Sequence, residues 1–521
     1  MIALSSIIGS GWLFGSQEGA MIAGPAAVLS WIIGAVIIGI IALIYVELGT
    51  MFPQSGGMSR YAQFSHGSLL GFISSWANWV SLVTLIPIEA VAAVQYMSSW
   101  PWAWANWTRG FMKQGVITTE GLMIVFLFMV VFTLMNYYSV NLMAKFTSFI
   151  SIFKVAIPAL TIIMIMVSGF DPNNFGHNLH EFMPFGSAPV LAATTSAGII
   201  FSYNAFQTVL NLAGEIKHPK KNISRAIILS LVISAVIYVL LQVAFIGGVP
   251  NHMLVTKGWH GLNFNSPFAE IAILLGLNWL STLLYLDAFI SPLGTGVAFV
   301  GTTSRTLASM SQNHHIPAQL GDINPKYKIP RKAMLTNLVI SMILVSIFKK
   351  WDMLAAVIST STLIAYLTGP VTAVSLRKMG PDLIRPVKTK ALNLMAPLSF
   401  VLTSLAIYWG KFPTTFEVIL VVIIGLPVYM YYEHKNGWQK FGQQFKSAAW
   451  MITYLIVLSI MSYIGSHEFG GINLVPYPVD MLMIVILALI FYYWAIKSAH
   501  KNAYFDEAIE LNKAANQEEK Q

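Results

Sequence analysis

The sequence of 521 residues contains no cysteine and very few charged residues. Without cysteine there can be no disulfide, no thiolate metal site, no iron–sulfur cluster and no cysteine nucleophile. Only 10% of the residues are Asp, Glu, Lys or Arg, whereas soluble proteins carry about 25%. Most of the exterior must therefore face lipid, which excludes soluble enzymes and nucleic-acid-binding proteins.

The sequence also lacks the motifs of membrane enzymes and ATP-driven pumps. Its 11 histidines fall in expected loops or at the ends of expected spans, and no span supplies ligands at metal-binding spacing. No phosphate-binding loop of the G-x-x-x-x-G-K type is present. We therefore expect no metal, no cofactor and no catalysis.

Long apolar segments dominate the chain, of which 56% is hydrophobic. A bilayer core of about 30 Å requires about 20 apolar residues per helix. Windows of this size predict an all-α integral membrane protein of about fourteen transmembrane helices, at 1–22, 25–52, 68–98, 121–141, 142–169, 190–214, 224–248, 279–305, 333–349, 352–377, 391–410, 414–433, 447–465 and 479–498. The first span has almost no residues ahead of it, so we expect the natural chain to begin upstream of Met1.

The basic residues predict the orientation of these spans. With the N-terminus in the cytoplasm, most of the 30 Lys and Arg residues fall in inner loops, as the positive-inside rule requires. We therefore expect a multi-pass protein of the plasma membrane with both termini in the cytoplasm, and we attribute the net charge of +9 to this topology. The polar, acidic stretch from Asp506 predicts a disordered cytoplasmic tail.

Two expected spans, the first and the sixth, contain interruptions. The first carries three glycines within IIGSGWLFG, and the sixth carries a polar cluster within AGIIFSYNAFQ. Lipid cannot form hydrogen bonds with freed backbone groups, so a break at this depth is stable only beside protein or a water-filled cavity. Breaks five spans apart, at matching positions of two five-helix halves, indicate the substrate site of a secondary transporter. The alternative is that the glycines only permit close helix packing.

The chemistry of two such breaks suits a zwitterion. Amides at a helix N-terminus attract an anion, and carbonyls at a C-terminus attract a cation. We expect the first break to bind an α-carboxylate and the second to bind an α-ammonium group. The predicted substrate-binding residues are Ile7, Gly9, Ser10 and Gly11, together with Phe201, Ser202, Tyr203 and Asn204.

Charged residues inside spans are expensive to insert and are therefore candidates for function. Lys154 lies about 12 residues from either end of its span, too far for its side chain to reach the interface comfortably. It could face Asp287, and the two would then share a proton. Glu89, in the outer third of the third span, could serve selectivity or proton access, and we count it with Lys154 and Asp287 as a candidate for proton coupling. The alternative for Glu89 is a position along an outer vestibule, and the alternative for Asp287 is such a position or the satisfaction of a broken backbone.

Three further charged residues lie near the cytoplasmic ends of spans. We expect Glu47, Arg60 and Glu215 to form an inner gate network, with Lys217 or Arg225 as further partners.

Several motifs share a pattern with a known family. They are IIGSGWLF, the stretch from Gly24 that ends in MFPQSGGMSRYAQFSHG, AGEIKHPKKNISRAI from Ala213, and the segment from SPLGTG to SRTLASMSQNHHIP. Over residues 1 to about 390 the chain thereby resembles the amino acid, polyamine and organocation (APC) superfamily. More narrowly, ISIFKVAIP, LDAFISPLGTG and KSAAWMITYLIVLSIMSYIG resemble the bacterial aspartate-proton symporter group.

This resemblance implies a fold and a function. The fold is a leucine-transporter-like inverted repeat of five plus five helices over 1–390, followed by four additional helices over 391–499 and a tail over 500–521. The amino acid would bind at the unwound parts of helices 1 and 6. In proton-coupled members, a lysine placed like Lys154 resembles an amine that replaces a sodium ion between helices 1, 5 and 8.

We therefore expect a proton symporter that imports amino acids, acidic ones in particular, by alternating access, with amino acid, protons and the lipid bilayer as its partners. One alternative is a proton-coupled or exchanging transporter for neutral amino acids. An alternative from another class is a non-transporting amino acid sensor. A sensor should carry a soluble output domain. The longest soluble segment expected here is a tail of about 22 residues, which argues against a sensor.

Overall fold

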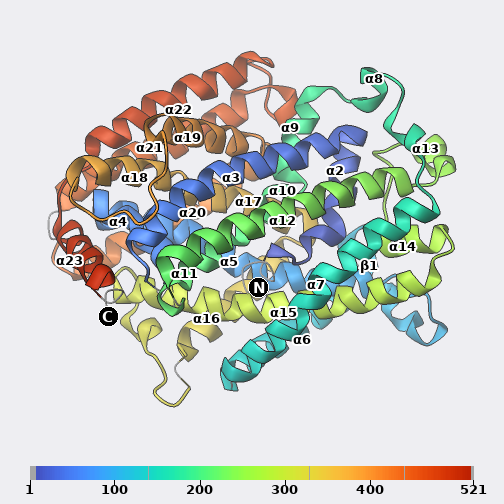
Figure 1. Cartoon of the computed structure of the whole chain (residues 1–521), viewed down its shortest axis with the longest axis horizontal. Coiled ribbons are helices and arrows are strands. Elements are labelled where there is room, and N and C mark those ends of the chain that lie inside the picture. The colour runs from blue at the N-terminus through green and yellow to red at the C-terminus, as the bar shows by residue number, and fades with distance from the viewer. Residues whose placement is uncertain are drawn as a thin grey trace.

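The protein is an all-α membrane protein, as its apolar segments predicted. The computed structural model describes residues 7–54, 56–138, 140–216, 218–327, 329–438 and 441–517. Long helices lie side by side along one direction (Figure 1). Within the described ranges the only strands are β1 (Met112–Lys113) and β2 (Val116–Ile117), an antiparallel pair with Met112 opposite Ile117.

Each of the fourteen predicted segments contains at least one helix. The first five hold α2 (Gly11–Ala23), α3 (Ala27–Met51), α5 (Ser68–Met97), α6 (Thr119–Tyr138) and α7 (Val140–Ser168). The next five hold α9 (Ser187–Ser196), α10 (Ile199–Tyr203), α11 (Gln207–Asn211), α12 (Pro219–Gly248), α15 (Asn278–Gln312), α16 (Arg331–Ile347), α17 (Trp351–Tyr366) and α18 (Thr368–Met379). The last four hold α19 (Leu392–Tyr408), α20 (Thr414–Lys435), α21 (Phe441–Ile464) and α22 (Val479–Ser498).

Length and hydropathy qualify nine helical segments of the described chain as membrane spans, with α2 and α3 joined into one segment, Gly11–Met51. The sixth predicted span is absent from these nine because it is divided into α9, α10 and α11. Short helices lie in the connections: α4 (Tyr61–His66), α8 (Leu179–Phe182), α13 (Asn251–Lys257) and α14 (Pro267–Leu274). One end of the bundle carries α4 and α11, and the opposite end carries α8, α13, α14 and β1 (Figure 1).

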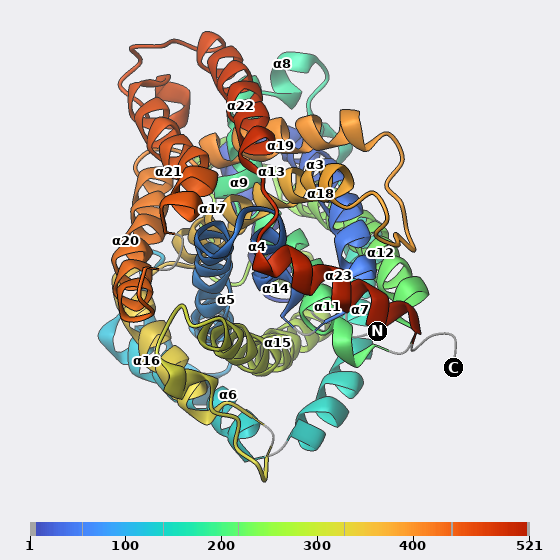
Figure 2. The ribbon, with the colours of Figure 1, turned by 90° about the vertical axis from the view of Figure 1, so that its left-hand side faces the viewer.

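Burial separates central helices from peripheral ones. The most apolar part of α5 is buried all around, because α15 and α17 pack against it (Figure 2). On α12, by contrast, Leu229, Val232 and Val236 recur at helical spacing and are more than half exposed. Such a stripe on a membrane protein faces lipid. The central position of α5 matters for function because it carries Glu89.

The four C-terminal spans cover one side of the central helices. α20 and α21 pack against α5, and α19 packs against α3 and α17. In Figure 2 these orange and red helices form a separate layer on that side. The division of the chain at residue 390 stays a prediction.

The disorder predicted from Asp506 onward is wrong for residues 506–517, which belong to helix α23 (Ala503–Gln517). The Asn502 side chain caps the helix by accepting hydrogen bonds from the backbone N–H groups of Tyr504 (2.9 Å) and Phe505 (3.2 Å). Phe505, Ala508 and Asn512 are buried at helical spacing. Although the segment is mostly polar, these three residues form a narrow buried stripe along which α23 packs against the bundle (Figure 2).

Helix α23 connects two segments that are far apart in the sequence. The Asn512 amide donates to the carbonyl oxygens of Met51 (3.1 Å) and Ile384 (2.9 Å), and it accepts from the Ile384 N–H (2.9 Å). Glu507 forms an ion pair with Arg60 at 3.0 Å. The end of α3 and the loop after α18 are thereby held by the same helix.

Candidate substrate and proton site

The first predicted break lies directly before α2. Ile8, Gly9 and Ser10 are not helical, and α2 begins at Gly11. The Ile7 carbonyl accepts hydrogen bonds from the Gly9 N–H (3.1 Å) and from the Tyr238 hydroxyl (2.8 Å). Residues 1–6 lie outside the described residues, so the inner part of the first predicted span is not placed.

The second predicted break has two irregular points. The chain leaves helical geometry at Gly198, whose φ of 75° is left-handed, while Phe201, Ser202 and Tyr203 lie within the short helix α10. A second irregularity follows in the 3₁₀ turn Asn204–Phe206. Both irregularities lie within AGIIFSYNAFQ, the segment in which we expected the interruption, and they flank Phe201, Ser202 and Tyr203. The left-handed backbone at Gly198 favours glycine, and a Cβ there would also lie 3.0 Å from Ala355 and from the Trp351 ring.

The carbonyls predicted to bind an ammonium group already have donors. The Phe201 carbonyl accepts from the Asn204 N–H, and the Asn204 carbonyl accepts from the Tyr366 hydroxyl at 3.1 Å. Each oxygen keeps a second lone pair, which leaves room for one further donor.

The two breaks face each other. A Cβ on Gly11 would collide with Ser202 Oγ, so only glycine allows this approach. Trp351 Nε1 donates to Ser10 Oγ at 3.1 Å, and Ser359 Oγ accepts from the Phe201 N–H at 3.2 Å. Residues predicted from two distant spans are thus brought together beside α17, which contributes two residues that the sequence analysis did not select.

A buried carboxylate occupies the first break. Glu89, in the last third of α5, is fully buried, and its Oε2 and Oε1 atoms accept from the Ser10 N–H at 3.0 and 3.2 Å. A Cβ on Gly9 would lie 2.7 Å from Glu89 Oε1, which explains the glycine. Glu89 therefore holds the position that we predicted for the substrate carboxylate.

Of the other two predicted coupling residues, Lys154 lies near both Glu89 and Asp287. Lys154 from α7 is buried, donates to Thr295 Oγ1 on α15, and interacts electrostatically with both Glu89 and Asp287. A Cβ on Gly9 would lie 3.2 Å from the Thr295 methyl group, so this threonine also borders the break. Thr295 was not predicted, although its position one turn after Ser291 in SPLGTG was a usable signal.

Asp287 differs from Glu89 in its hydrogen bonding. It is 2% exposed, and neither of its carboxylate oxygens has a hydrogen-bond partner among the described residues. The Ser291 hydroxyl, one helical turn away, also has no hydrogen-bond partner among the residues that the structure describes. Two unsatisfied acceptors beside a buried lysine make Asp287 an available proton acceptor.

The predicted inner gate network has different partners. Glu47 accepts from Arg377 Nε (2.9 Å), Arg377 Nη2 (2.5 Å) and the Thr389 N–H (2.7 Å), and Arg385 Nε lies 3.6 Å away. The expected pairing of Glu47 with Arg60 is wrong, because Arg60 is bound to Gln54 and to Glu507 on α23. The Glu215 side chain and Lys217 lie outside the described residues.

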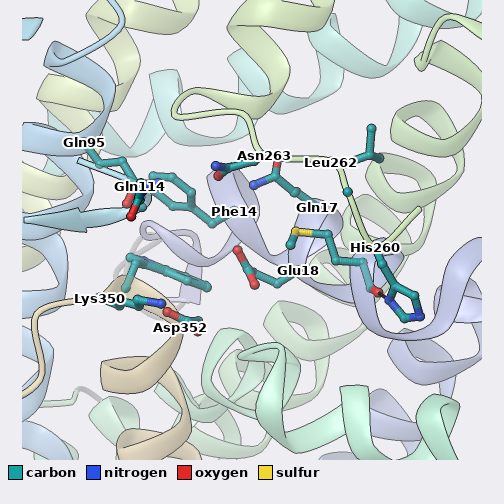
Figure 3. Close-up of a pocket in the computed structure, with 14 residues that line it drawn as sticks. Phe14, Gln17, Glu18, Gln95, Gln114, His260, Leu262, Asn263, Lys350 and Asp352 are labelled. Carbon is teal, nitrogen blue, oxygen red and sulfur yellow. Dashed lines mark hydrogen bonds between the residues drawn. The ribbon is translucent and has the colours of Figure 1, made fainter. Parts of the chain in front are cut away.

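Aromatic rings separate the first break from a cavity. The Phe14 ring packs against Trp351 at 5.1 Å and edge-on against Tyr96 at 5.3 Å, and Phe201 meets Trp351 at 5.9 Å between centroids. Phe14 and Trp351 also line a cavity of 310 Å³ (Figure 3).

Comparison with known proteins agrees with this geometry. The family model for amino acid permeases matches residues 1–432. The chain is 49% identical to the glutamate/serine transporter AimA of Bacillus subtilis over 98% of this chain and 95% of that protein. It is 36% identical to the aspartate-proton symporter of the same organism, over 95% of this chain and 94% of that protein. The chain therefore belongs to the amino acid permease family and is a multi-pass membrane transporter of amino acids, not an enzyme.

Proposed function

We propose that this protein imports acidic amino acids, aspartate or glutamate, by proton symport with alternating access. The observation that carries the proposal is the hydrogen bonding of the Glu89 carboxylate to the Ser10 N–H at the start of α2. An amino acid bound at this break would present its own carboxylate to the same amide.

The two carboxylates compete for one position, and this competition links substrate to protons. When Glu89 is charged, it holds the amide and repels the substrate carboxylate. Protonation removes the charge and weakens the hydrogen bond, so the substrate carboxylate can take its place. Substrate and proton then bind together and leave together, which is the requirement for symport.

Lys154 and Asp287 provide a route for the proton. Lys154 interacts with both carboxylates, and Asp287 has free acceptor positions among the described residues. A proton that leaves Glu89 can be compensated by a closer pairing of Lys154 with that carboxylate. The helices α5, α7 and α15 would shift relative to one another as this pairing changes.

The names of two relatives support the substrate and the driving ion. One relative is named a glutamate/serine transporter, and the other is named an aspartate-proton symporter. Because the first name also includes serine, a neutral amino acid is an alternative substrate. Uptake measurements distinguish an acidic substrate from a neutral one.

The test is uptake by proteoliposomes under an imposed pH gradient. We expect labelled aspartate or glutamate to accumulate when the inside is alkaline, and to stop accumulating when a protonophore collapses the gradient. Unlabelled serine, leucine and lysine serve as competitors. If serine competes and aspartate and glutamate do not, the substrate is a neutral amino acid. If substrate accumulates without a pH gradient, proton coupling is contradicted.

The Lys154→Ala variant tests the charge cluster separately. We expect loss of gradient-driven accumulation with retained exchange of internal for external amino acid, because exchange requires no net proton movement. Lys113→Ala, an exposed lysine on the hairpin of β1 and β2, is the matched control. Undiminished accumulation in Lys154→Ala would exclude a role in coupling.

We also propose that both termini lie in the cytoplasm of a cell whose plasma membrane holds the protein. The absence of cysteine allows a single reporter at Lys378→Cys, an exposed position at the end of α18. In intact cells this cysteine should resist an impermeant thiol reagent, and it should react after permeabilisation. Reaction in intact cells would invert the topology.

A further inference from the structure

An apolar groove runs between helices α3 and α12. The two helices pack against each other and lie side by side (Figure 1). The groove has a volume of 500 Å³, and apolar side chains of both helices line it, together with Tyr203 of α10. Val36 on one wall and Val236 on the other are more than half exposed. The groove is therefore open to the lipid that surrounds the protein.

The groove has the length of one leaflet of a bilayer. On α12 its lining runs from Leu231 to Leu240, which is about 14 Å at the helical rise. Half of a hydrocarbon core is about 15 Å thick. On α3 the groove is widened at Gly39, where a Cβ would meet no atom within 4 Å. An extended hydrocarbon chain matches this shape.

A basic pocket lies at the start of α12. Its volume is 500 Å³, and it is lined by three basic residues, a serine and two residues of the loop after α18: Lys220, Lys221, Arg225, Ser224, Pro386 and Val387. None of the described residues that line it is acidic. Lys221 and Arg225 are exposed, and neither forms an ion pair within the described part of the chain. The pocket therefore attracts an anion.

The basic pocket lies at one end of the apolar groove. Arg225 precedes Leu231 by about 9 Å along α12. On the other wall, Thr389 Oγ1 donates to the Leu43 carbonyl at 3.0 Å, one helical turn beyond Gly39. The loop after α18 is thereby held against α3 where the groove ends. A single molecule can therefore occupy both the pocket and the groove.

This combination matches an anionic phospholipid. Basic pockets beside membrane-spanning helices bind anionic lipid headgroups. A zwitterionic headgroup would bring an additional ammonium group to a pocket that already holds three basic side chains. Free phosphate would satisfy the pocket and leave the groove without an occupant. Only a molecule with both an anionic headgroup and a hydrocarbon chain uses the whole surface.

We propose that one anionic phospholipid binds here, with its phosphate at Lys221 and Arg225 and an acyl chain in the groove. The chain contacts Tyr203, which lies between the two irregular points of the second break. The Tyr203 hydroxyl donates to the Trp31 carbonyl on α3 at 3.3 Å, so this ring lies between the groove wall and the broken segment. The inference goes beyond the proposed function, and it depends on neither the substrate nor proton coupling.

Native mass spectrometry of the full-length protein in detergent tests this site, because it resolves individual bound lipids. Dioleoyl phosphatidylglycerol and dioleoyl phosphatidylcholine share their acyl chains and differ in net charge. Glycerol phosphate is added as a competitor that carries the anion without the chains. The apparent Kd of the first bound lipid is measured for each.

Two pairs of variants have matched controls. Lys221→Gln with Arg225→Gln removes two charges from the pocket, and Lys378→Gln with Lys435→Gln removes two exposed charges at the ends of α18 and α20. Gly39→Leu places a side chain in the groove. Gly442→Leu is its control, because Gly442 is an exposed position of α21 where a Cβ also meets no atom within 4 Å.

We expect the wild type to bind phosphatidylglycerol at least about tenfold more tightly than phosphatidylcholine. Loss of the charges of Lys221 and Arg225 should weaken the binding of phosphatidylglycerol about thirtyfold, which corresponds to about 2 kcal/mol. Gly39→Leu should weaken it about tenfold, because about two CH₂ groups displaced from the groove already account for that factor. Both controls should bind like the wild type, and glycerol phosphate should not displace the lipid.

Three results would overturn this site. Equal binding of the two lipids to the wild type would mean that the groove holds bilayer lipid without selecting its headgroup. An equal loss in the two charge pairs would place the anion elsewhere. Displacement by glycerol phosphate, with no effect of Gly39→Leu, would identify a site for free phosphate. A failure of gradient-driven uptake would contradict the proposed symport and would leave the lipid measurement unaffected.

Discussion

The competition between Glu89 and the substrate carboxylate predicts an unusual variant. Glu89→Gln keeps the shape of the side chain and removes its charge. In the wild type, both carboxylate oxygens lie within 3.2 Å of the Ser10 N–H, so substrate must displace a charge-assisted hydrogen bond. Such bonds contribute about 1.5–3 kcal/mol, and neutral ones contribute about 0.5–1.5 kcal/mol. The glutamine should therefore be easier to displace by about 1–1.5 kcal/mol, which corresponds to about tenfold in Kd.

Equilibrium binding of labelled glutamate to purified protein at pH 6 and pH 8 measures this difference. Wild-type protein should bind more tightly at pH 6, because protonation of Glu89 frees the amide. Glu89→Gln should bind about tenfold more tightly than the wild type at pH 8, with little change between the two pH values. Glu120→Gln, at an exposed position near the start of α6, should behave like the wild type. Weaker binding by Glu89→Gln at both pH values, or a retained pH dependence, would refute the competition.

Three further predictions concern the stability of the protein and of helix α23. Arg377→Ala should lower stability by about 1.5–3 kcal/mol, because it removes charge-assisted hydrogen bonds to buried Glu47 while Arg385 remains near that carboxylate, whereas the exposed Lys378→Ala should have little effect on the thermal midpoint. Asn512→Ala removes three hydrogen bonds and should increase protease cleavage within α23, without a change in the rest of the bundle. Burial lowers the pKa of His315 from 6.5 to about 3. Between these two pH values the unfolded chain binds a proton at this histidine and the folded chain does not. Acidification to pH 5 should therefore lower the free energy of unfolding by about 2 kcal/mol. His315→Phe should lose less thermal stability than the wild type between pH 7 and pH 5, and an equal loss in both proteins would contradict this assignment.

The charged residues inside spans show what local sequence can predict and what it cannot. Glu89, Lys154 and Asp287 were selected because a charge in lipid is expensive wherever the helix lies, and this cost depends on composition alone. The structure brings all three to one place, from α5, α7 and α15. Their roles stay predictions. The hydrogen bond of Glu89 to Ser10 spans 79 residues of sequence, and no local pattern indicates it.

The second break lies in the predicted segment, and its backbone departs from α-helical geometry at Gly198 and at Asn204–Phe206. The polar residues Ser202 and Asn204 are conspicuous in an apolar segment, but helix α10 accommodates the first, and the second is satisfied by Thr362 and Tyr366. The backbone leaves the helix at Gly198, which the sequence shows as an ordinary glycine. Only its neighbours Trp351 and Ala355 reveal that no side chain fits there.

The sequence by itself determined that this chain is a membrane-embedded helical protein, where its helices lie, and which charged residues are unusual, because hydropathy and helix length are properties of contiguous residues. The tertiary structure alone decided the partners: Glu47 with Arg377, Arg60 with α23, and Glu89 with the first break. Those contacts join residues 79 to 447 positions apart. Helices of similar composition can pack in many arrangements, and close packing at Gly9 and Gly11 selects the one in which these groups meet.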